Sequence, residues 1–440
     1  MLLGVPRVRW VGLLGTVAVG IFAALAILVG TPATGSAVGF FTFTKIADED
    51  TLIPGGTGTL GLLERPVIDS GVVAFTNTNP SESVIVAAPV GGALTTVASN
   101  TTIDPVTGLP FGNARFGSTP SFDGSTVAFG TPVGGVYAIP VSGGPAVLLA
   151  NPSTAIPNGS GTFDSVHDPS IDGGNVMVEG QTNFGVQDGI YSSAPAGASL
   201  SVVADLNDVV PPALTSNFTR VRDPSIDGAN VAWHGRSGTT FAWFDGIYTN
   251  FGSGVSVDES MAIPGGSGTF SGSSVPFGNP SLSGTEVAFI GRGSSSQRGV
   301  YLSSGGVVSA VADKNTAIPS GTGNFTSFEN EVSLDNGNIA FVGSGSSSQR
   351  GLYSTLGGTL QEVIANGALL DGQALGTVWM GEESISGDQI VFPTSVLEGD
   401  LPMTGGTTLL FIDPLGRPMS PTSAAGAHRR HRRRAVRHIR

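Results

Sequence analysis

A ten-residue phrase recurs seven times along this chain of 440 residues. It reads PSFDGSTVAF at 120–129, PSIDGANVAW at 224–233 and PSLSGTEVAF at 280–289, and the other copies begin at residues 66, 169, 332 and 383. Successive copies start 49 to 56 residues apart. A fixed period of this length indicates a repeat architecture in which each unit is one small supersecondary element.

Each copy of the phrase predicts a β-hairpin. Its first three residues form a short strand, and Asp-Gly or Ser-Gly then makes a tight turn because glycine accepts positive φ. Val-Ala-Phe forms the next strand, with alternate side chains on one face. A third strand follows, as in RGVY at 298–301, and a fourth follows that, as in VSAVAD at 308–313. Four short antiparallel strands per repeat predict an all-β fold, a seven-bladed β-propeller.

The two ends of the repeat array complement each other. Residues 44–60, TKIADEDTLIPGGTGTL, match residues 309–325, SAVADKNTAIPSGTGNF, so the array begins with a fourth strand. The last repeat offers only three strands, the third near 407–411. We therefore expect the N-terminal strand to complete the last blade, which closes the ring and removes two exposed sheet edges.

The N-terminus has the order of residues typical of an export signal. Arg7 and Arg9 precede an uncharged apolar run over 10–30. The run is also just long enough to span a bilayer, so a cleaved signal peptide and an uncleaved membrane anchor both stay open. We expect three parts: the signal or anchor at 1–37, the propeller at 38–413, and a tail at 414–440. The expected location is secreted or cell-envelope.

Charge is divided unevenly along the chain. All acidic residues lie between Asp48 and Asp413, whereas the last thirteen residues, HRRHRRRAVRHIR, contain seven arginines and no acid. We expect this tail to be disordered and to contact an anionic surface, polymer or nucleic acid, or to fold back on the acidic propeller. The chain has no cysteine, which excludes disulfides and thiolate sites.

The repeat resembles that of TolB-type bacterial β-propellers. The features that carry the resemblance are the proline, the acidic-glycine turn, the apolar strand, the tyrosine strand and the glycine-pair turn, over residues 39–413. The resemblance implies a propeller fold, an export-related setting and no catalytic residues.

The residue before each phrase is the sharpest candidate for function, because in a propeller these positions ring one mouth of the central channel. We call them the channel-mouth ring: Arg65, Thr119, Asp168, Asp223, Asn279, Glu331 and Glu382. Calcium prefers several oxygen ligands, so the carboxylates of Asp168, Asp223, Glu331 and Glu382 are candidate ligands for it. His167 precedes Asp168 and is a further candidate for ligand contact or catalysis.

One other feature, a repeated loop, maps to the same, top face, where the first strand of each blade begins. The loop SSSQRG occurs at 294–299 and 346–351 and presents Arg298 and Arg350 as candidate ligand contacts, although duplication of one blade also explains it. A zinc site is not expected, because neither His167 nor His234 has a second histidine at ligand spacing.

The sequence favours a non-enzymatic, exported or surface propeller that binds a protein, glycan or small ligand through its top face. The alternative is a secreted polysaccharide hydrolase or lyase that uses carboxylates at the channel mouth, since such a pair has no local sequence signature. A purely structural repeat protein of the envelope is the third possibility.

Overall fold

A computed structural model of the chain describes residues 41–413. It leaves out 80–81, 113–115, 118, 133, 183–185, 212–215, 240–241, 273–274, 371–372 and 398–406. The predicted signal or anchor and the basic tail lie outside the described residues. Within those residues, no helix is long and apolar enough to cross a membrane.

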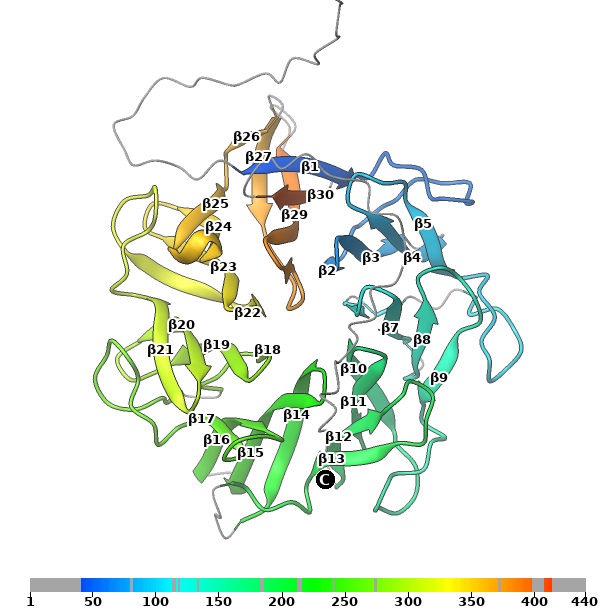
Figure 1. Ribbon diagram of the computed structural model, residues 1–440, viewed down its shortest axis with the longest axis horizontal. Coiled ribbons are helices and arrows are strands. Elements are labelled where there is room, and N and C mark those ends of the chain that lie inside the picture. The colour runs from blue at the N-terminus through cyan, green and yellow to red at the C-terminus, as the bar shows by residue number, and fades with distance from the viewer. Residues whose placement is uncertain are drawn as a thin grey trace, which may run out of the picture. The chain divides into compact units, whose positions relative to one another are not determined.

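Seven antiparallel sheets stand around a central axis, as Figure 1 shows, which confirms the predicted seven-bladed propeller. Blade 1 has β2 (Val67–Asp69), β3 (Val72–Asn79), β4 (Glu82–Pro89) and β5 (Thr95–Ser99). Blade 2 has β6 (Ser121–Phe122), β7 (Thr126–Gly130), β8 (Val136–Pro140) and β9 (Val147–Ala150). Blade 3 has β10 (Ser165–Asp172), β11 (Asn175–Gln181), β12 (Asp188–Ser193) and β13 (Ser201–Asp205).

The next three blades repeat this order. Blade 4 has β14 (Phe218–Asp227), β15 (Asn230–Thr239), β16 (Ala242–Thr249) and β17 (Val255–Asp258). Blade 5 has β18 (Ser281–Ser283), β19 (Glu286–Arg292), β20 (Arg298–Ser304) and β21 (Val307–Asp313). Blade 6 has β22 (Phe325–Asp335), β23 (Asn338–Gly345), β24 (Arg350–Ser354), the 3-10 turn η2 (Leu356–Gly358) and β25 (Gln361–Ala365).

Blade 7 joins the two ends of the array. It runs from β28 (Ile385–Ser386) through β29 (Gln389–Leu397) and β30 (Thr407–Asp413) to β1 (Thr42–Ala47), which pairs antiparallel with β30. The predicted closure by the N-terminal strand is therefore confirmed. A short hairpin of β26 (Leu369–Leu370) and β27 (Gln373–Val378) extends this sheet by pairing with β29.

Aromatic side chains fill the space between neighbouring blades. In blade 5, Phe289 stacks on Tyr301 at 5.8 Å, and the edge of Phe270 meets Tyr301 at 5.2 Å. Gly291 lies under this cluster, because a Cβ atom there would stand 2.6 Å from the Phe270 ring. The glycine that follows the apolar residues within β19 is therefore needed for aromatic packing.

Serine side chains tie the first strand of one blade to the next, close to the channel. In five places a serine Oγ accepts a hydrogen bond of 2.8 to 3.2 Å from a backbone amide of the following blade: Ile171 to Ser121, Ile226 to Ser170, Leu282 to Ser225, Leu334 to Ser281 and Ile385 to Ser333. These bonds fix the height and spacing of the strands that carry the channel-mouth ring.

Blade 1 lacks this serine and has the buried Val67 in its place. Glu383 of blade 7 extends past blade 1 to blade 2 and replaces the missing serine as hydrogen-bond acceptor. Its Oε2 accepts from the Phe122 amide at 3.0 Å, and its Oε1 accepts from the Ser121 hydroxyl at 2.6 Å. Burial of this carboxyl raises its pKa to about 8. Glu383 thus bridges the break that Val67 makes in the serine pattern.

Candidate functional site

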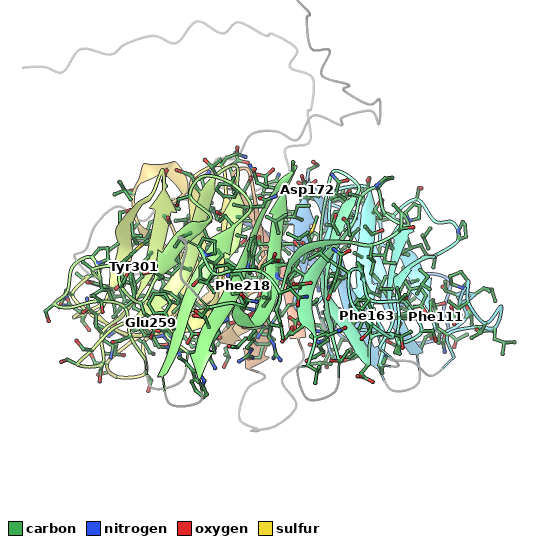
Figure 2. All side chains as sticks on the ribbon, turned by 90° about the horizontal axis from the view of Figure 1, so that it is seen from below. Phe111, Phe163, Asp172, Phe218, Glu259 and Tyr301 are labelled. Carbon is green, nitrogen blue, oxygen red and sulfur yellow. The ribbon has the colours of Figure 1, made fainter. Side chains whose placement is uncertain are left out.

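The first strands of the blades carry the channel-mouth ring to one face of the propeller. Figure 2 shows the disc from its side, with Asp172, the last residue of the first strand β10, toward one face and Glu259, after the fourth strand β17, toward the other. At the face where first strands begin, a cavity of about 200 Å³ is lined by Arg65, Thr119, Asp168, Asp223, Asn279 and Glu382, with Pro169 and Pro224. Six of the seven ring residues therefore meet in one cavity.

Two pairs of side chains in the channel-mouth ring are hydrogen-bonded to each other. Arg65 Nη1 donates to Glu331 Oε1 at 2.5 Å, which brings the seventh ring residue to the same mouth. Asn279 Nδ2 donates to Glu382 Oε1, also at 2.5 Å. Burial, followed by the nearby carboxylates of Asp223 and Glu331, raises the pKa of Glu382 to about 7. Glu331 and Glu382 thus have partners within the ring.

Asp168 and Asp223 reach the cavity through matching irregularities of the backbone. Both have positive φ, 45° and 54°, and both precede a proline. The register of β10 against β11 shifts between His167 and Ser170, and β14 shifts against β15 at the equivalent place. Such bulges re-aim a side chain, and a non-glycine residue in this conformation costs about 1–2 kcal/mol. The fold keeps this strain at two carboxylates of the candidate site.

A buried charged network extends from these aspartates into blade 4. His234 is only 4% exposed, and its Nε2 lies 3.2 Å from Asp245 Oδ1 while its Nδ1 lies 4.0 Å from Asp223 Oδ2. Arg236 Nε donates to the same Asp245 oxygen at 2.8 Å. Burial raises the pKa of Asp223, and the charge of His234 opposes that rise. The network links a cavity carboxylate to a buried histidine.

A second part of the network lies in blade 3. The Glu179 side chain is 1% exposed, and burial raises its pKa to about 8. Arg222 Nε stands 3.4 Å from Glu179 Oε1 and 3.7 Å from Asp188 Oδ2. Burial also raises the pKa of Asp188 to about 6, although Arg222 opposes the rise. His167 closes the group through Asp168, with Nδ1 at 2.8 Å from Asp168 Oδ2.

Sequence reasoning missed Glu179, Asp188, Arg222 and Asp245, and it gave His234 no role. A signal was present in the repeat. Glu179 and His234 follow the apolar triplet of the second strand at the position where blades 5 and 6 have Ile290 and Val342. A charged residue at a position that is apolar in sister repeats indicates a departure from simple packing.

The two loop arginines lie apart from the cavity wall. Arg350 contacts Glu329 at 2.6 Å and the Val378 carbonyl at 3.0 Å, while Arg298 donates to Asn330 at 2.9 Å. Neither lines the channel-mouth cavity that the described residues enclose. The glutamine of the second SSSQRG loop, Gln349, accepts from the Thr322 amide at 2.8 Å. The loop therefore hydrogen-bonds to the connector between two blades and stabilises it. Its role in ligand contact stays a prediction.

Asp168, Asp223 and Glu382 line one cavity, but no three of the four predicted calcium ligands bring ligand atoms within 4.8 Å of one another among the described residues. The side chains there that can bring three ligand atoms within 4.8 Å of one another are His167, Asp168 and Glu179. Of the four predicted carboxylates, only Asp168 belongs to this set. A calcium site at the channel mouth stays a prediction.

The sheets and the cavity define the class of this protein: a seven-bladed β-propeller with an acidic channel mouth. The model of a protein family of unknown function, DUF7453, matches residues 116–386, so the chain belongs to that family. No curated protein matches the chain.

Several solved structures are similar to the chain at low identity. The acylaminoacyl peptidase of Pyrococcus horikoshii is 12% identical, with 79% of this chain and 50% of that chain covered and a TM-score of 0.44. A puromycin-hydrolyzing peptidase of Mycobacterium tuberculosis is 13% identical, with 78% and 60% covered and a TM-score of 0.36. YCF48 from Cyanidioschyzon merolae is 12% identical, with 84% and 99% covered and a TM-score of 0.41.

The chain spans about half the length of the first of these peptidases. The propeller fold rests on the seven sheets themselves, and the TolB-type resemblance stays a prediction.

Proposed function

We propose that this protein is an exported, non-catalytic propeller that binds a protein or glycan by a cationic group at its channel mouth. The observation that carries the proposal is the imbalance of charge around the cavity. Its wall has two aspartates, Asp168 and Asp223, and the carboxyl group of Glu382, whose pKa is about 7, against one cation, Arg65. Arg65 is already paired with Glu331. An ammonium or guanidinium group supplies the missing positive charge.

The size of the cavity limits what enters it. At about 200 Å³ it is smaller than a pocket for a drug-sized molecule, about 300–1,000 Å³. A lysine or arginine side chain, or the amino group of a sugar, suits this volume. The rest of such a ligand would then lie across the top face, where the rigid ring of blades offers a broad surface.

An export-related location is part of the proposal and has separate support. The paired arginines and apolar run before residue 31 have the order of an export signal. Expression of the full chain in a bacterium tests this part. Recovery outside the cytoplasm supports it, and complete retention in the cytoplasm contradicts it.

Calorimetric titration of the full chain tests the binding site. Lysine amide, arginine amide and glucosamine are the cationic probes, and N-acetylglucosamine is the neutral probe. We expect only the cationic probes to bind, and we expect Asp168→Asn and Asp223→Asn each to weaken binding at least about tenfold, or 1.4 kcal/mol. Asp388→Asn is the matched control, because Asp388 is exposed in a turn between first and second strands. Equal binding of neutral and cationic probes, or none of either, contradicts the proposal.

Cleavage of polysaccharide is a second candidate, favoured by one observation. Glu382 has a pKa of about 7 and lines the same cavity as Asp168 and Asp223. A glycosidase needs a protonated acid beside a second carboxyl group, and a Glu382 with a pKa of about 7 is partly protonated at neutral pH. Release of reducing ends that disappears in Glu382→Gln would support this candidate. No release from acidic, neutral and amino polysaccharides would remove it.

A further inference from the structure

We propose that Arg292 and Arg298 of blade 5 bind a tetrahedral oxyanion, the phosphate or sulfate group of a ligand, on the top face. Arg292 ends β19, Arg298 begins β20, and the two are directly opposite each other in the pairing of these strands. Their guanidinium groups converge on one neutral atom, Oδ1 of Asn330 in the neighbouring blade 6 (Figure 1). Arg292 Nη2 donates to this oxygen at 3.0 Å and Arg298 Nη2 at 2.9 Å. Two cations thus share an acceptor that carries no charge.

Neither arginine has a carboxylate partner in the part of the chain that the structure describes. No carboxylate oxygen there lies within 4.0 Å of a side-chain nitrogen of Arg292 or Arg298. The two acids that attract Arg298 electrostatically each have another arginine as ion-pair partner: Glu329 with Arg350 at 2.6 Å, and Glu331 with Arg65 at 2.5 Å. The described residues therefore leave the positive charge of the pair without a counter-ion.

Holding the two guanidinium groups together is unfavourable. Like charges directly opposite each other on neighbouring strands repel. Burial, followed by the charge of Arg292, lowers the pKa of the half-buried Arg298, against the attraction of Glu329 and Glu331. The buried Nε–H group of Arg298 also has no hydrogen-bond acceptor among the described residues. An anion beside both guanidinium groups relieves their repulsion.

The duplicated loop in blade 6 is an internal comparison. Arg350 has the same position in its SSSQRG loop as Arg298 has in the first copy. The residue opposite Arg350 is Ser344 rather than a second arginine, and Glu329 provides a carboxylate at 2.6 Å. Blade 6 therefore neutralises its arginine within the protein, whereas blade 5 has two arginines and no acid partner. This difference marks blade 5 as the copy that can accept an external anion.

The surroundings hold the pair in place and leave it accessible. Arg292 Nη1 donates to the Val275 carbonyl at 2.6 Å, which fixes the orientation of that guanidinium group. Gly278 allows the backbone of Asn330 to come close, because a Cβ atom at Gly278 would stand 2.8 Å from the Asn330 carbonyl oxygen. Asn330 itself is exposed. Its side chain can therefore move aside, and an oxygen of the anion can take the place of Oδ1.

The charge of the pair indicates the kind of anion. Two guanidinium groups carry two positive charges, which a phosphate dianion or sulfate matches and a single carboxylate matches only by half. One oxygen of a tetrahedral group can occupy the position of Asn330 Oδ1, and the other oxygens can accept from further N–H groups of the two arginines. The inference goes beyond the proposed function, since neither arginine lines the channel-mouth cavity.

Calorimetric titration with inorganic phosphate and with sulfate tests the proposal. The tail at 428–440 contains seven arginines that bind such anions themselves, so the parent for the test is the full chain with these seven replaced by glutamine. At about pH 8, where phosphate is a dianion, and at constant ionic strength, we expect one equivalent of either anion to bind. Acetate should bind at least about tenfold more weakly. Tighter binding of phosphate indicates a phosphorylated ligand, and tighter binding of sulfate a sulfated one.

Substitutions locate the anion. Arg292→Gln and Arg298→Gln should each weaken phosphate binding at least about tenfold, because each removes one of the two charges. Asn330→Asp places a carboxylate where the two guanidinium groups converge, so it should abolish phosphate binding and raise the melting temperature in phosphate-free buffer. The matched control is the double variant Glu329→Gln, Arg350→Gln, which removes the ion pair of the duplicated loop without changing the net charge. It should bind phosphate at least as tightly as the parent does.

Other outcomes overturn the proposal. A parent that binds neither phosphate nor sulfate contradicts it, and unchanged affinity in both single arginine variants would place the anion elsewhere. Retained phosphate binding in Asn330→Asp would show that the anion does not use the point where the two guanidinium groups meet. Titration of the same variants with arginine amide reads the channel-mouth cavity separately. Its result bears on the proposed function and leaves the result for phosphate independent.

Discussion

Replacing Glu383 by alanine removes the one side chain that bridges the break in the serine pattern. The change takes the acceptor from the Phe122 amide and from the Ser121 hydroxyl, and both residues are buried, at 4% and 2% exposure. A buried polar group left without a partner costs about 1–3 kcal/mol. Two such groups give an expected loss of about 2–6 kcal/mol in the free energy of unfolding.

A second substitution checks that this reasoning is correct. Val67→Ser places a hydroxyl at the position where the other blades have serine. By analogy with the Ile171–Ser121 bond, this hydroxyl would accept a hydrogen bond from the Phe122 amide, which Glu383 accepts in the wild type. In the wild type it should destabilise, because Val67 is fully buried and the Phe122 amide already has a partner. In the Glu383→Ala background it should recover about 1 kcal/mol.

Urea unfolding followed by circular dichroism measures all four proteins of this double-mutant cycle. Asp388→Ala is the control for removing an acid, with an expected change within about 0.5 kcal/mol. The reasoning is refuted if Glu383→Ala costs no more than the control, or if Val67→Ser has the same effect in both backgrounds.

Three further predictions concern the whole propeller. The folded-state pKa values of Glu382 and Glu383, about 7 and 8, lie above the unfolded value, so the stability that these groups contribute is present at pH 4 and is lost as pH rises through 7 and 8. The melting temperature should fall from pH 5 to pH 9, with a smaller fall in Glu383→Gln; a rise would contradict this. Gly291→Ala should cost about 1–3 kcal/mol in urea unfolding, because its Cβ would stand 2.6 Å from Phe270, whereas Gly130→Ala has no atom within 4 Å and should be neutral. Deleting residues 42–47 should unpair the edge of β30 and produce association in size-exclusion chromatography, and a monomer of unchanged melting temperature would count against closure by β1.

The fold could be predicted from the sequence because the local structure of each repeat is determined by residues within that repeat. The Asp-Gly turns, the alternating strands and the near-constant period are all local features. Closure of the ring of blades could also be predicted, since residues 44–60 match residues 309–325. The position of the channel-mouth ring followed from the fold alone, because one position per repeat must occupy equivalent places around the axis.

The chemistry of the site was less accessible, because it depends on contacts between repeats. The pairing of Arg65 with Glu331 joins residues from blades 1 and 6, which no local pattern reveals. Positive φ at Asp168 could not be predicted, since an aspartate before a proline is ordinarily extended. The blade 3 and blade 4 network requires the register that sets His167 opposite Glu179.

A crystal structure of the full chain with arginine amide tests the central claim most directly. The account predicts the guanidinium group inside the channel-mouth cavity, within hydrogen-bonding distance of the carboxylates of Asp168 and Asp223. Arginine amide bound only at the outer loops, with its guanidinium away from both aspartates, would contradict it.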